Sequence, residues 1–412
     1  MRVLIAPDSF KGSLGAAAVA AALAEGWLSV RPGDQVTRLP LADGGEGTLD
    51  VLATTVSGAR WHRAKVTGPG GAPVTARWLE LPSGSSGLQG RGNAAPAQLG
   101  RGAAALPFLG AKTAVVELAR ASGLPLLARP DPMRAQTTGL GELLGRALDA
   151  GMGRILVGLG GSASTDGGTG ALAALGARFL NAKGQSLPPG GGTLADLVSA
   201  DLTHLRPPPP GGVSCLTDVT APLLGARGAA AVFGPQKGAD EGQIARLEAG
   251  LARLAEMLGG EPDAPGAGAA GGTGYGLAAA WGAQLTSGAA ELGRLAGLDR
   301  ALTDADLVIT GEGRFDETSM AGKTCGTVIA AAAAAGVPVA VVAGQASNGI
   351  MTREPGHDGI PALTAVLTLA GLAGETAGAL ASPRRWLRRA GGRLASDAGA
   401  ESSPRQPENY QA

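Results

Sequence analysis

The chain has 412 residues, and its 34 basic and 34 acidic side chains give a formal net charge of zero. This balance, without a basic stripe, argues against nucleic acid as a partner. The hydrophobic fraction of 44% is sufficient for a full core, and the length favours two domains rather than one. Two cysteines form no disulfide framework and no metal-binding spacing, which favours a cytoplasmic location.

Apolar runs and helix breakers at both ends of the chain predict alternating strands and helices. No secretory signal is expected at the start, because the first apolar run soon meets Pro7 and Asp8. The uncharged segment 328–343 breaks at Gly336 and Pro338, so it predicts a helix, a turn and a strand rather than a membrane span. Strands are expected over 2–6, 35–40, 306–310, 337–343 and 363–369, and helices over 16–30 and 322–335. Together these segments predict an α/β fold in which both chain ends build one doubly wound parallel sheet.

The middle of the chain has a different pattern. Strands are expected on either side of a Gly/Pro turn within 65–77, and then over 113–119 and 154–159, with a helix over 171–176. We therefore expect a first domain made of 1–65 and 286–395, a second α/β domain inserted over 66–285, and a ligand site in the cleft between them. The Gly/Ala/Ser/Gln-rich stretch 83–106 is expected to be a mobile insert, and 396–412 a disordered tail.

Lysine is rare in this chain and lies where an anion could bind. Only six of the 34 basic residues are lysines, and Lys11, Lys237 and Lys323 each lie in a short glycine-flanked motif beside hydroxyl or acidic side chains. A lysine ammonium is a compact charge that suits a phosphate or carboxylate in a tight site.

The segment Gly158–Gly168 carries the strongest local signal. A predicted strand leads into a loop of five glycines that also holds Ser162, Ser164, Thr165 and Asp166, and a helix is expected to follow. Backbone N–H groups in such a loop can cradle phosphate, the hydroxyls can donate to it, and Asp166 could hold Mg²⁺. The loop also fits a loose dinucleotide-binding pattern, but the ribose-binding acid expected about 20 residues later is missing.

Acidic residues follow three other predicted strands or apolar segments. Asp43 and Glu46 lie among glycines, where they either face a ligand or form a capped turn. Asp218 follows an apolar segment, where it could act as a metal ligand, as a general base or as a turn residue. Glu312, Arg314 and Asp316 alternate just after a strand. None of the three histidines lies in these motifs, so a histidine triad is not expected, and the inventory suits phosphoryl transfer.

Nine segments, in order along the chain, resemble the glycerate kinases of the bacterial two-domain class. They are APDSFKGSL (6–14), PLADGGEGT (40–48), ELARASGL (117–124), TTGLGELL (137–144), GLGGSASTDGGTGALAALG (158–176), TDVTAPL (217–223), FGPQKGAD (233–240), GAGAAGGTGYGL (266–277) and DLVITGEGRFDETSMAGKT (306–324). The resemblance implies a Rossmann-like first domain, MgATP as co-substrate, and phosphorylation of D-glycerate. The product implied is 2-phosphoglycerate, with 3-phosphoglycerate left open. Thr165 and Thr217 depart from the family's usual Asn and Cys, but the neighbouring Asp is kept in both motifs.

We accordingly expect an ATP-dependent D-glycerate kinase. The expected catalytic residues are Lys11, Asp43, Asp218 and Lys237, and the expected substrate-binding residues are Ser9, Glu46, Arg314 and Asp316. The expected nucleotide-binding residues are Gly160, Gly161, Ser162, Ser164, Thr165, Glu312 and Lys323, and the expected Mg²⁺ ligands are Asp166 and Asp218. The alternatives are an NAD(P)-dependent hydroxyacid dehydrogenase that uses the 158–163 loop, and a non-catalytic protein that binds a small ligand. The predicted partners are glycerate and ATP, with a homodimer as an option.

Overall fold

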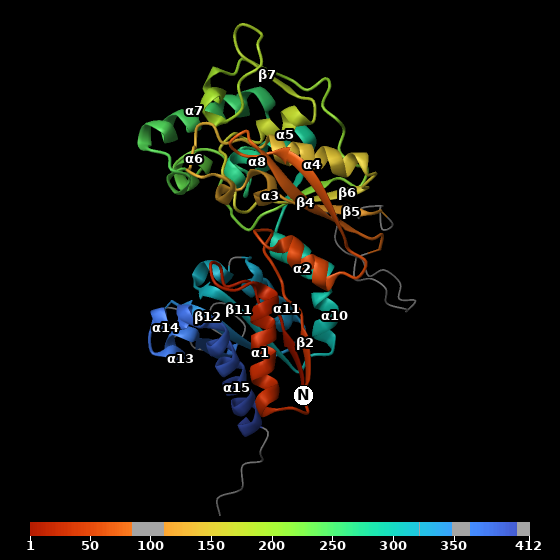
Figure 1. Ribbon diagram of the computed structural model, residues 1–412, viewed down its shortest axis with the longest axis vertical. Coiled ribbons are helices and arrows are strands. Elements are labelled where there is room, and N and C mark those ends of the chain that lie inside the picture. The colour runs from red at the N-terminus through yellow and green to blue at the C-terminus, as the bar shows by residue number, and fades with distance from the viewer. Residues whose placement is uncertain (85–110, 321, 348–362, 402–412) are drawn as a thin grey trace, which may run out of the picture. The chain divides into compact units, whose positions relative to one another are not determined.

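The protein consists of two compact α/β units. The computed structural model describes residues 1–84, 111–320, 322–347 and 363–401. Unit 1 comprises Met1–Ala42 and Ala296–Ala412, and unit 2 comprises Asp43–Leu295. Figure 1 shows the red and blue ends of the chain together in unit 1, with the middle of the chain forming unit 2. This agrees with the prediction of an α/β fold in which one sheet is built from both chain ends.

Unit 1 is built on a five-stranded sheet in the order β13-β12-β11-β1-β2, in which every neighbouring pair is parallel. Its strands are β1 (Arg2–Ile5), β2 (Gln35–Arg38), β11 (Leu307–Phe315), β12 (Val339–Ala346) and β13 (Leu363–Thr368). Its helices are α1 (Ala16–Val30), α10 (Leu298–Thr303), the short 3₁₀ helix η4 (Glu317–Met320), α11 (Thr324–Ala334), α13 (Leu369–Ala373), α14 (Thr376–Ala381) and α15 (Pro383–Glu401).

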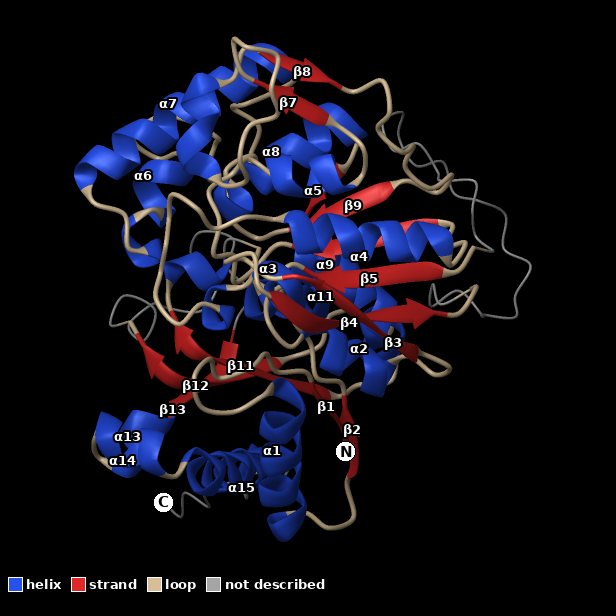
Figure 2. Ribbon diagram, turned by 45° about the horizontal axis from the view of Figure 1, so that its top comes forward, coloured by secondary structure: helices blue, strands red, loops and turns tan. Residues whose placement is uncertain are grey.

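The two faces of this sheet bury separate cores. Because side chains alternate along a strand, Val3 and Ile5 point to one face and Leu4 to the other. The first core packs Val3 and Ile5 with α1 and α15, and the second packs Leu4 with α10 and α11. Figure 2 shows α1 and α15 side by side beneath the strands of unit 1. Helices on both faces confirm the predicted doubly wound sheet.

The C-terminal segment differs in part from the prediction. The disordered tail expected over 396–412 is wrong for residues 396–401, because α15 continues through Glu401. Leu394 and Ala395 of this helix are buried in the first core of unit 1, and that packing carries the helix into the predicted tail. Residues 402–412, and nearly all of the predicted insert 83–106, lie outside the described residues.

Unit 2 contains a six-stranded sheet in the order β10-β9-β6-β5-β4-β3. The pairs β3–β4 and β4–β5 are antiparallel, whereas β5, β6, β9 and β10 run parallel. The strands are β3 (Arg60–Thr67), β4 (Pro73–Leu81), β5 (Thr113–Glu117), β6 (Arg154–Gly158), β9 (Val213–Leu216) and β10 (Gln284–Thr286), with β7 (Arg178–Leu180) and β8 (Ser199–Asp201) forming a separate pair.

The helices of unit 2 cover this sheet. They are α2 (Thr48–Thr55), α3 (Ala119–Ser122), α4 (Thr138–Asp149), α5 (Thr169–Ala174), α6 (Ala229–Phe233), α7 (Glu241–Leu258), α8 (Ala269–Trp281) and α9 (Gly288–Ala296), with 3₁₀ helices η1 (Leu124–Leu126), η2 (Gly191–Asp196) and η3 (Pro235–Lys237). One continuous core joins the sheet to helices α3 to α8 and includes Val157, Leu172, Leu251 and Tyr275. Within the described residues, no helix combines the length and the apolar character needed to cross a membrane.

The borders between the units lie elsewhere than the predicted 65/66 and 285/286. The first predicted border would cut β3 near its end, before Val66, although β3 pairs along its whole length with β4. The second would cut β10, which pairs with β9. The contact-based borders follow Ala42 and Leu295 instead. That each unit folds as an independent domain stays a prediction.

Candidate active site

In unit 2, the loop 43–47 lies directly on the carboxyl ends of two parallel strands. A β-carbon added at Gly158, the last residue of β6, would lie 2.4 Å from the carbonyl oxygen of Gly44. One added at Gly160 would lie 2.5 Å from the Cα of Gly45, and Gly44 itself packs against Leu216 at the end of β9. Only glycine allows such contact of backbone with backbone, so the glycines hold this loop where α/β sheets bind ligands.

This arrangement brings Asp43 and Asp218 close to one another. The Asp218 carboxylate accepts hydrogen bonds from the Ser287 hydroxyl at 2.9 Å, the Gly288 N–H at 2.9 Å and the Ala289 N–H at 3.3 Å. The pKa of Asp218 is raised to about 6, mainly by burial; the hydrogen bond from Ser287 opposes this rise, and the negative charge of Asp43 contributes to it. The predicted candidates Asp43 and Asp218 therefore form one acidic pair, whereas Glu46 is exposed.

The polar side chains of the glycine loop are mostly turned into the protein. Ser164, Thr165 and Asp166 are fully buried, and Ser162 is 8% exposed. The Asp166 carboxylate accepts the N–H of Thr137 at 2.9 Å and its hydroxyl at 2.7 Å, and it also accepts the N–H groups of Gly168 and Gly170 at 3.3 Å. The acid therefore ties this loop to the start of α4. Gly161 is the exposed residue of the loop.

Lys237 is buried behind the same loop, with only 2% of its surface exposed. Its ammonium donates to the carbonyl oxygen of Ser164 and, at 3.5 Å, to the hydroxyl of Ser162. Burial lowers the pKa of Lys237 to about 8, although the nearby charge of Asp166 opposes that shift. The structure thus brings Lys237 into contact with the glycine loop, and its buried ammonium supports the loop from inside the protein.

In unit 1, a second set of predicted residues lies at the carboxyl ends of the neighbouring parallel strands β1 and β11. Asp8 is buried, accepts the Thr324 hydroxyl at 2.9 Å and accepts the Ser9 N–H at 2.6 Å. These contacts join the segment that carries Ser9 and Lys11 to the start of α11. Lys11 itself is exposed.

The end of β11 carries the alternating charges that the sequence indicated. One carboxylate oxygen of Glu312 is buried without a hydrogen-bond partner among the described residues, and burial raises the pKa of this acid. Arg314 is exposed and pairs with Asp316 at 3.4 Å. Lys323 donates to the Thr318 hydroxyl at 2.8 Å. Unit 1 therefore offers exposed cations together with the half-buried acid Glu312 at the carboxyl end of its sheet.

Two residues of the buried framework are not singled out by the sequence. Thr137 holds Asp166, and Glu117 accepts the N–H of Leu49 at the start of α2. Both lie in segments that carry the family resemblance, TTGLGELL and ELARASGL, and that resemblance is the signal that could have pointed to them.

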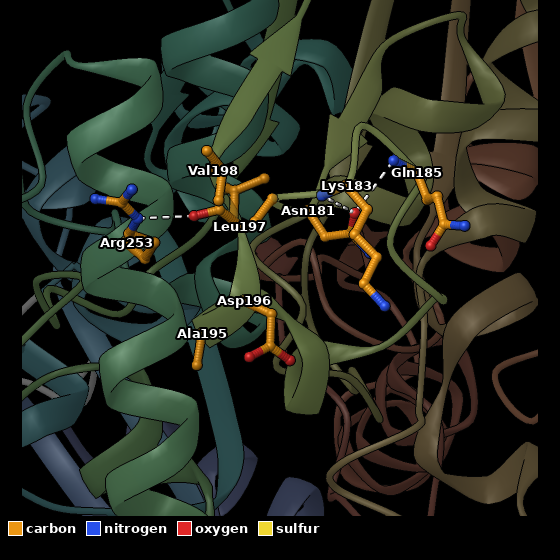
Figure 3. A pocket seen from close by; sticks show the side chains of 9 residues that line it. Asn181, Lys183, Gln185, Ala195, Asp196, Leu197, Val198 and Arg253 are labelled. Carbon is orange, nitrogen blue, oxygen red and sulfur yellow. Dashed lines mark hydrogen bonds between the residues drawn. The ribbon is translucent and has the colours of Figure 1, made fainter.

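A cavity of about 420 Å³ lies in another part of unit 2, beside β7 and β8 (Figure 3). Its polar lining is engaged locally, because Arg253 donates to the Leu197 carbonyl oxygen at 2.7 Å and Asn181 accepts the N–H groups of Lys183 and Gln185. The residues that line it are Asn181, Ala182, Lys183, Gln185, Ala195, Asp196, Leu197, Val198 and Arg253, and none of them is a predicted site residue.

The comparisons with known proteins agree on one family. The model of the glycerate kinase family matches residues 3–398. A glycerate 2-kinase of Escherichia coli K12 is 39% identical over 385 residues, which cover 91% of this chain and 93% of the relative. A glycerate kinase of Bacillus subtilis 168 is 42% identical over 358 residues, which cover 84% of this chain and 86% of the relative.

A solved structure is similar over nearly the whole chain. A crystal structure from Salmonella typhimurium LT2, assigned as glycerate kinase 2, aligns with a TM-score of 0.75 and 36% identity, covering 97% of this chain and 99% of that one. The chain therefore belongs to the glycerate kinase family. This confirms the predicted resemblance and the predicted class of enzyme, a kinase with an alcohol group as acceptor.

The contact between Gly158 and Gly44 can be tested by adding a single methyl group. In Gly158→Ala the new Cβ would meet the Gly44 carbonyl oxygen, so the loop must move away from the strand end. We expect a loss of stability of about 1–3 kcal/mol and a fall in kcat/KM of about tenfold or more, measured by denaturant unfolding and steady-state kinetics. Gly145→Ala on α4 is the matched control, because the nearest atom is the end of the Arg206 side chain at 3.6 Å. Equal kinetics for the two variants would contradict the close contact.

The buried ammonium of Lys237 should make stability depend on pH. Because its folded pKa is lowered from 10.5 to about 8, the folded state binds fewer protons than the unfolded state between these values. The free energy of unfolding should therefore rise with pH across this window by up to about 3 kcal/mol and stay flat below it. Lys237→Met should remove that rise, whereas Lys183→Met, at an exposed position, should keep it. A rise that persists in Lys237→Met would show that another group causes it.

Proposed function

We propose that this protein transfers the terminal phosphoryl group of ATP to the 2-hydroxyl of D-glycerate with the help of Mg²⁺, forming 2-phosphoglycerate. The observation that carries the proposal is the acidic pair Asp43 and Asp218, which lies beside the glycine loop at the carboxyl ends of parallel strands. The name of the Escherichia coli relative, a glycerate 2-kinase, supports both the substrate and the product.

Asp218 is the proposed acceptor of the hydroxyl proton. A general base works best when its pKa lies near the operating pH, and burial raises the pKa of Asp218 to about 6. The three hydrogen bonds from Ser287, Gly288 and Ala289 fix the direction of its carboxylate. Such orientation lets the base meet a bound hydroxyl without further rearrangement.

Asp43 is the proposed protein ligand of Mg²⁺, in place of the predicted Asp166 and Asp218, since Asp218 is the proposed base. Mg²⁺ commonly takes one or two carboxylates and completes its shell with phosphate oxygens and water. The single carboxylate of Asp43 fits this demand, and the described residues contain no group of three or more such side chains that could hold a metal. Asp166 fits less well, because it is fully buried and already accepts four hydrogen bonds. When bound, Mg²⁺ would neutralise charge on the transferring phosphoryl group.

The glycine loop is the proposed nucleotide cradle, through the backbone of Gly160 and Gly161. The buried Ser162, Ser164 and Thr165 would shape this cradle, and Lys237 and Asp166 would stiffen it from behind. In unit 1, Lys11 or Arg314 would bind the substrate carboxylate, since both are exposed cations. The remaining predicted roles are kept as part of the proposal: Ser9, Glu46 and Asp316 for substrate, and Glu312 and Lys323 for nucleotide.

No specific contact in the described residues favours the dehydrogenase or the binding-protein alternative. A cytoplasmic location remains our proposal, and both cysteines are free and buried, which agrees with a reducing compartment. The homodimer stays a prediction.

³¹P NMR of the purified protein with MgATP and D-glycerate tests the proposed reaction. We expect ADP signals to grow together with a phosphomonoester signal that couples to one carbon-bound proton, as phosphate on the 2-position requires. Coupling to two protons would assign the 3-position and correct the product. The proposed function would be contradicted if the wild-type protein left ATP intact while a commercial kinase turned over in the same buffer.

A further inference from the structure

Glu117 is a buried acid at the carboxyl end of β5 that has no part in the proposed reaction. Only 1% of it is exposed, and it pairs across the sheet with Gly158, the strand end on which the 43–47 loop lies. A carboxylate is rarely buried this deeply unless it is paired. Its partners therefore indicate what it does.

The first partner is the start of α2. One oxygen of Glu117 accepts the N–H of Leu49 at 2.7 Å, and Leu49 is the second residue of that helix. The N-cap position of α2 is Gly47, which offers no side-chain cap of its own. Glu117, which lies on strand β5, therefore caps α2 in place of a side chain at position 47. An acidic side chain is favourable there because the N-terminus of a helix is the positive end of its dipole.

The second partner is Arg120, whose hydrogen bond fixes the direction of the Glu117 carboxyl group. The Arg120 Nε donates to the other oxygen of Glu117 at 2.8 Å, and the same guanidinium also binds Asp50 in the first turn of α2. Arg77 faces Asp50 at 3.8 Å. Burial raises the pKa of Glu117, while the Leu49 N–H and Arg120 oppose this shift.

A continuous series of hydrogen bonds leads from this capped helix end to Asp43. Thr48, next to Leu49, donates its hydroxyl to the carbonyl oxygen of Gly45 at 2.8 Å. The N–H of Gly45 in turn donates to the Asp43 carboxylate at 2.9 Å. Glu117 therefore holds the C-terminal end of the loop, at Leu49, and the hydrogen bond from Gly45 holds Asp43 at its N-terminal end.

We propose that Glu117 is a positioning residue that fastens the 43–48 loop through the N-terminus of α2 and so fixes the carboxylate of Asp43 for the reaction. The kinetic part of this inference rests on the proposed function, because it takes Asp43 to act in phosphoryl transfer. The fastening itself does not, since it concerns the loop in the protein alone.

Glu117→Gln tests the fastening with little change of volume. The amide can still accept the Leu49 N–H, but its NH₂ group would then face the donor of Arg120. Glu142→Gln is the matched control, because Glu142 also holds backbone in unit 2, accepting the N–H and the hydroxyl of Thr67 at 2.8 Å. Both changes should lower the melting temperature. Only Glu117→Gln should speed hydrogen exchange of the amides of residues 45–49, measured without ligands.

The kinetic test is a double-mutant cycle with Asp43→Asn. We expect Glu117→Gln to lower kcat by about tenfold to a hundredfold and to change the KM for ATP by no more than about twofold. In the Asp43→Asn background the same change should cost less than about twofold in kcat, because the carboxylate it positions is already absent. Glu142→Gln should have the same small effect in both backgrounds.

Three results would overturn the inference. The first is amide exchange of residues 45–49 that is the same in Glu117→Gln as in the wild type, and the second is exchange that is equal in Glu117→Gln and Glu142→Gln. The third is a fall in kcat from Glu117→Gln that is as large in the Asp43→Asn background as in the wild type. If Glu117→Gln fails to fold, Arg120→Gln releases the same acid from a partly exposed position, and the same readouts decide. An inactive wild type would contradict the proposed function alone, because hydrogen exchange would still decide whether Glu117 fastens the loop.

Discussion

The contact of one glycine backbone with another is the constraint on which the site depends. The loop 43–47 lies on the carboxyl ends of β6 and β9 because positions 158 and 160 carry no side chain. A third such position, Gly288, lies where an added Cβ would be 2.0 Å from the Asp43 carbonyl oxygen. These contacts bring Asp43 close enough to Asp218 for like charges to repel in a partly buried setting. Burial is the main cause of the raised pKa of Asp218, and the charge of Asp43, which this backbone packing brings near, adds to it.

A second layer of polar residues stiffens this arrangement from within the protein. Asp166 binds the start of α4, Lys237 binds the Ser164 carbonyl oxygen, and Glu117 caps α2. Buried polar groups are costly unless they are satisfied, and satisfied networks fix one conformation. The motif residues therefore divide into exposed ones, which we propose to face a ligand, and buried ones, which hold their loops in place. Residue type alone does not separate these two groups.

Much of the fold follows from local pattern, whereas the site depends on contacts between distant segments. The helix predicted over 16–30 is observed as Ala16–Val30, because its apolar spacing and the Arg-Pro-Gly end are local signals. The glycine motifs are also recognisable, but no local signal shows that Asp43 and Asp218 meet, since they lie in different motifs far apart along the chain. Burial is equally hidden in the sequence, which does not show that Asp166 is buried and anchors its loop through hydrogen bonds. The sequence shows Glu117 only as an acid at a strand end, and its contact with Leu49 is known only from the structure.

The central claim is that Asp43 and Asp218 act as one coupled pair, and the pH dependence of kcat/KM tests it most directly. The acid limb of the wild-type profile should have a midpoint near the pKa of Asp218, about 6. In Asp43→Asn the repulsion is removed, so the pKa of Asp218 falls and the midpoint should move to lower pH, while the rate itself decreases. The substrates titrate alike with both enzymes, so the difference between the profiles belongs to the protein. An acid limb at the same pH in both enzymes would contradict the coupled pair.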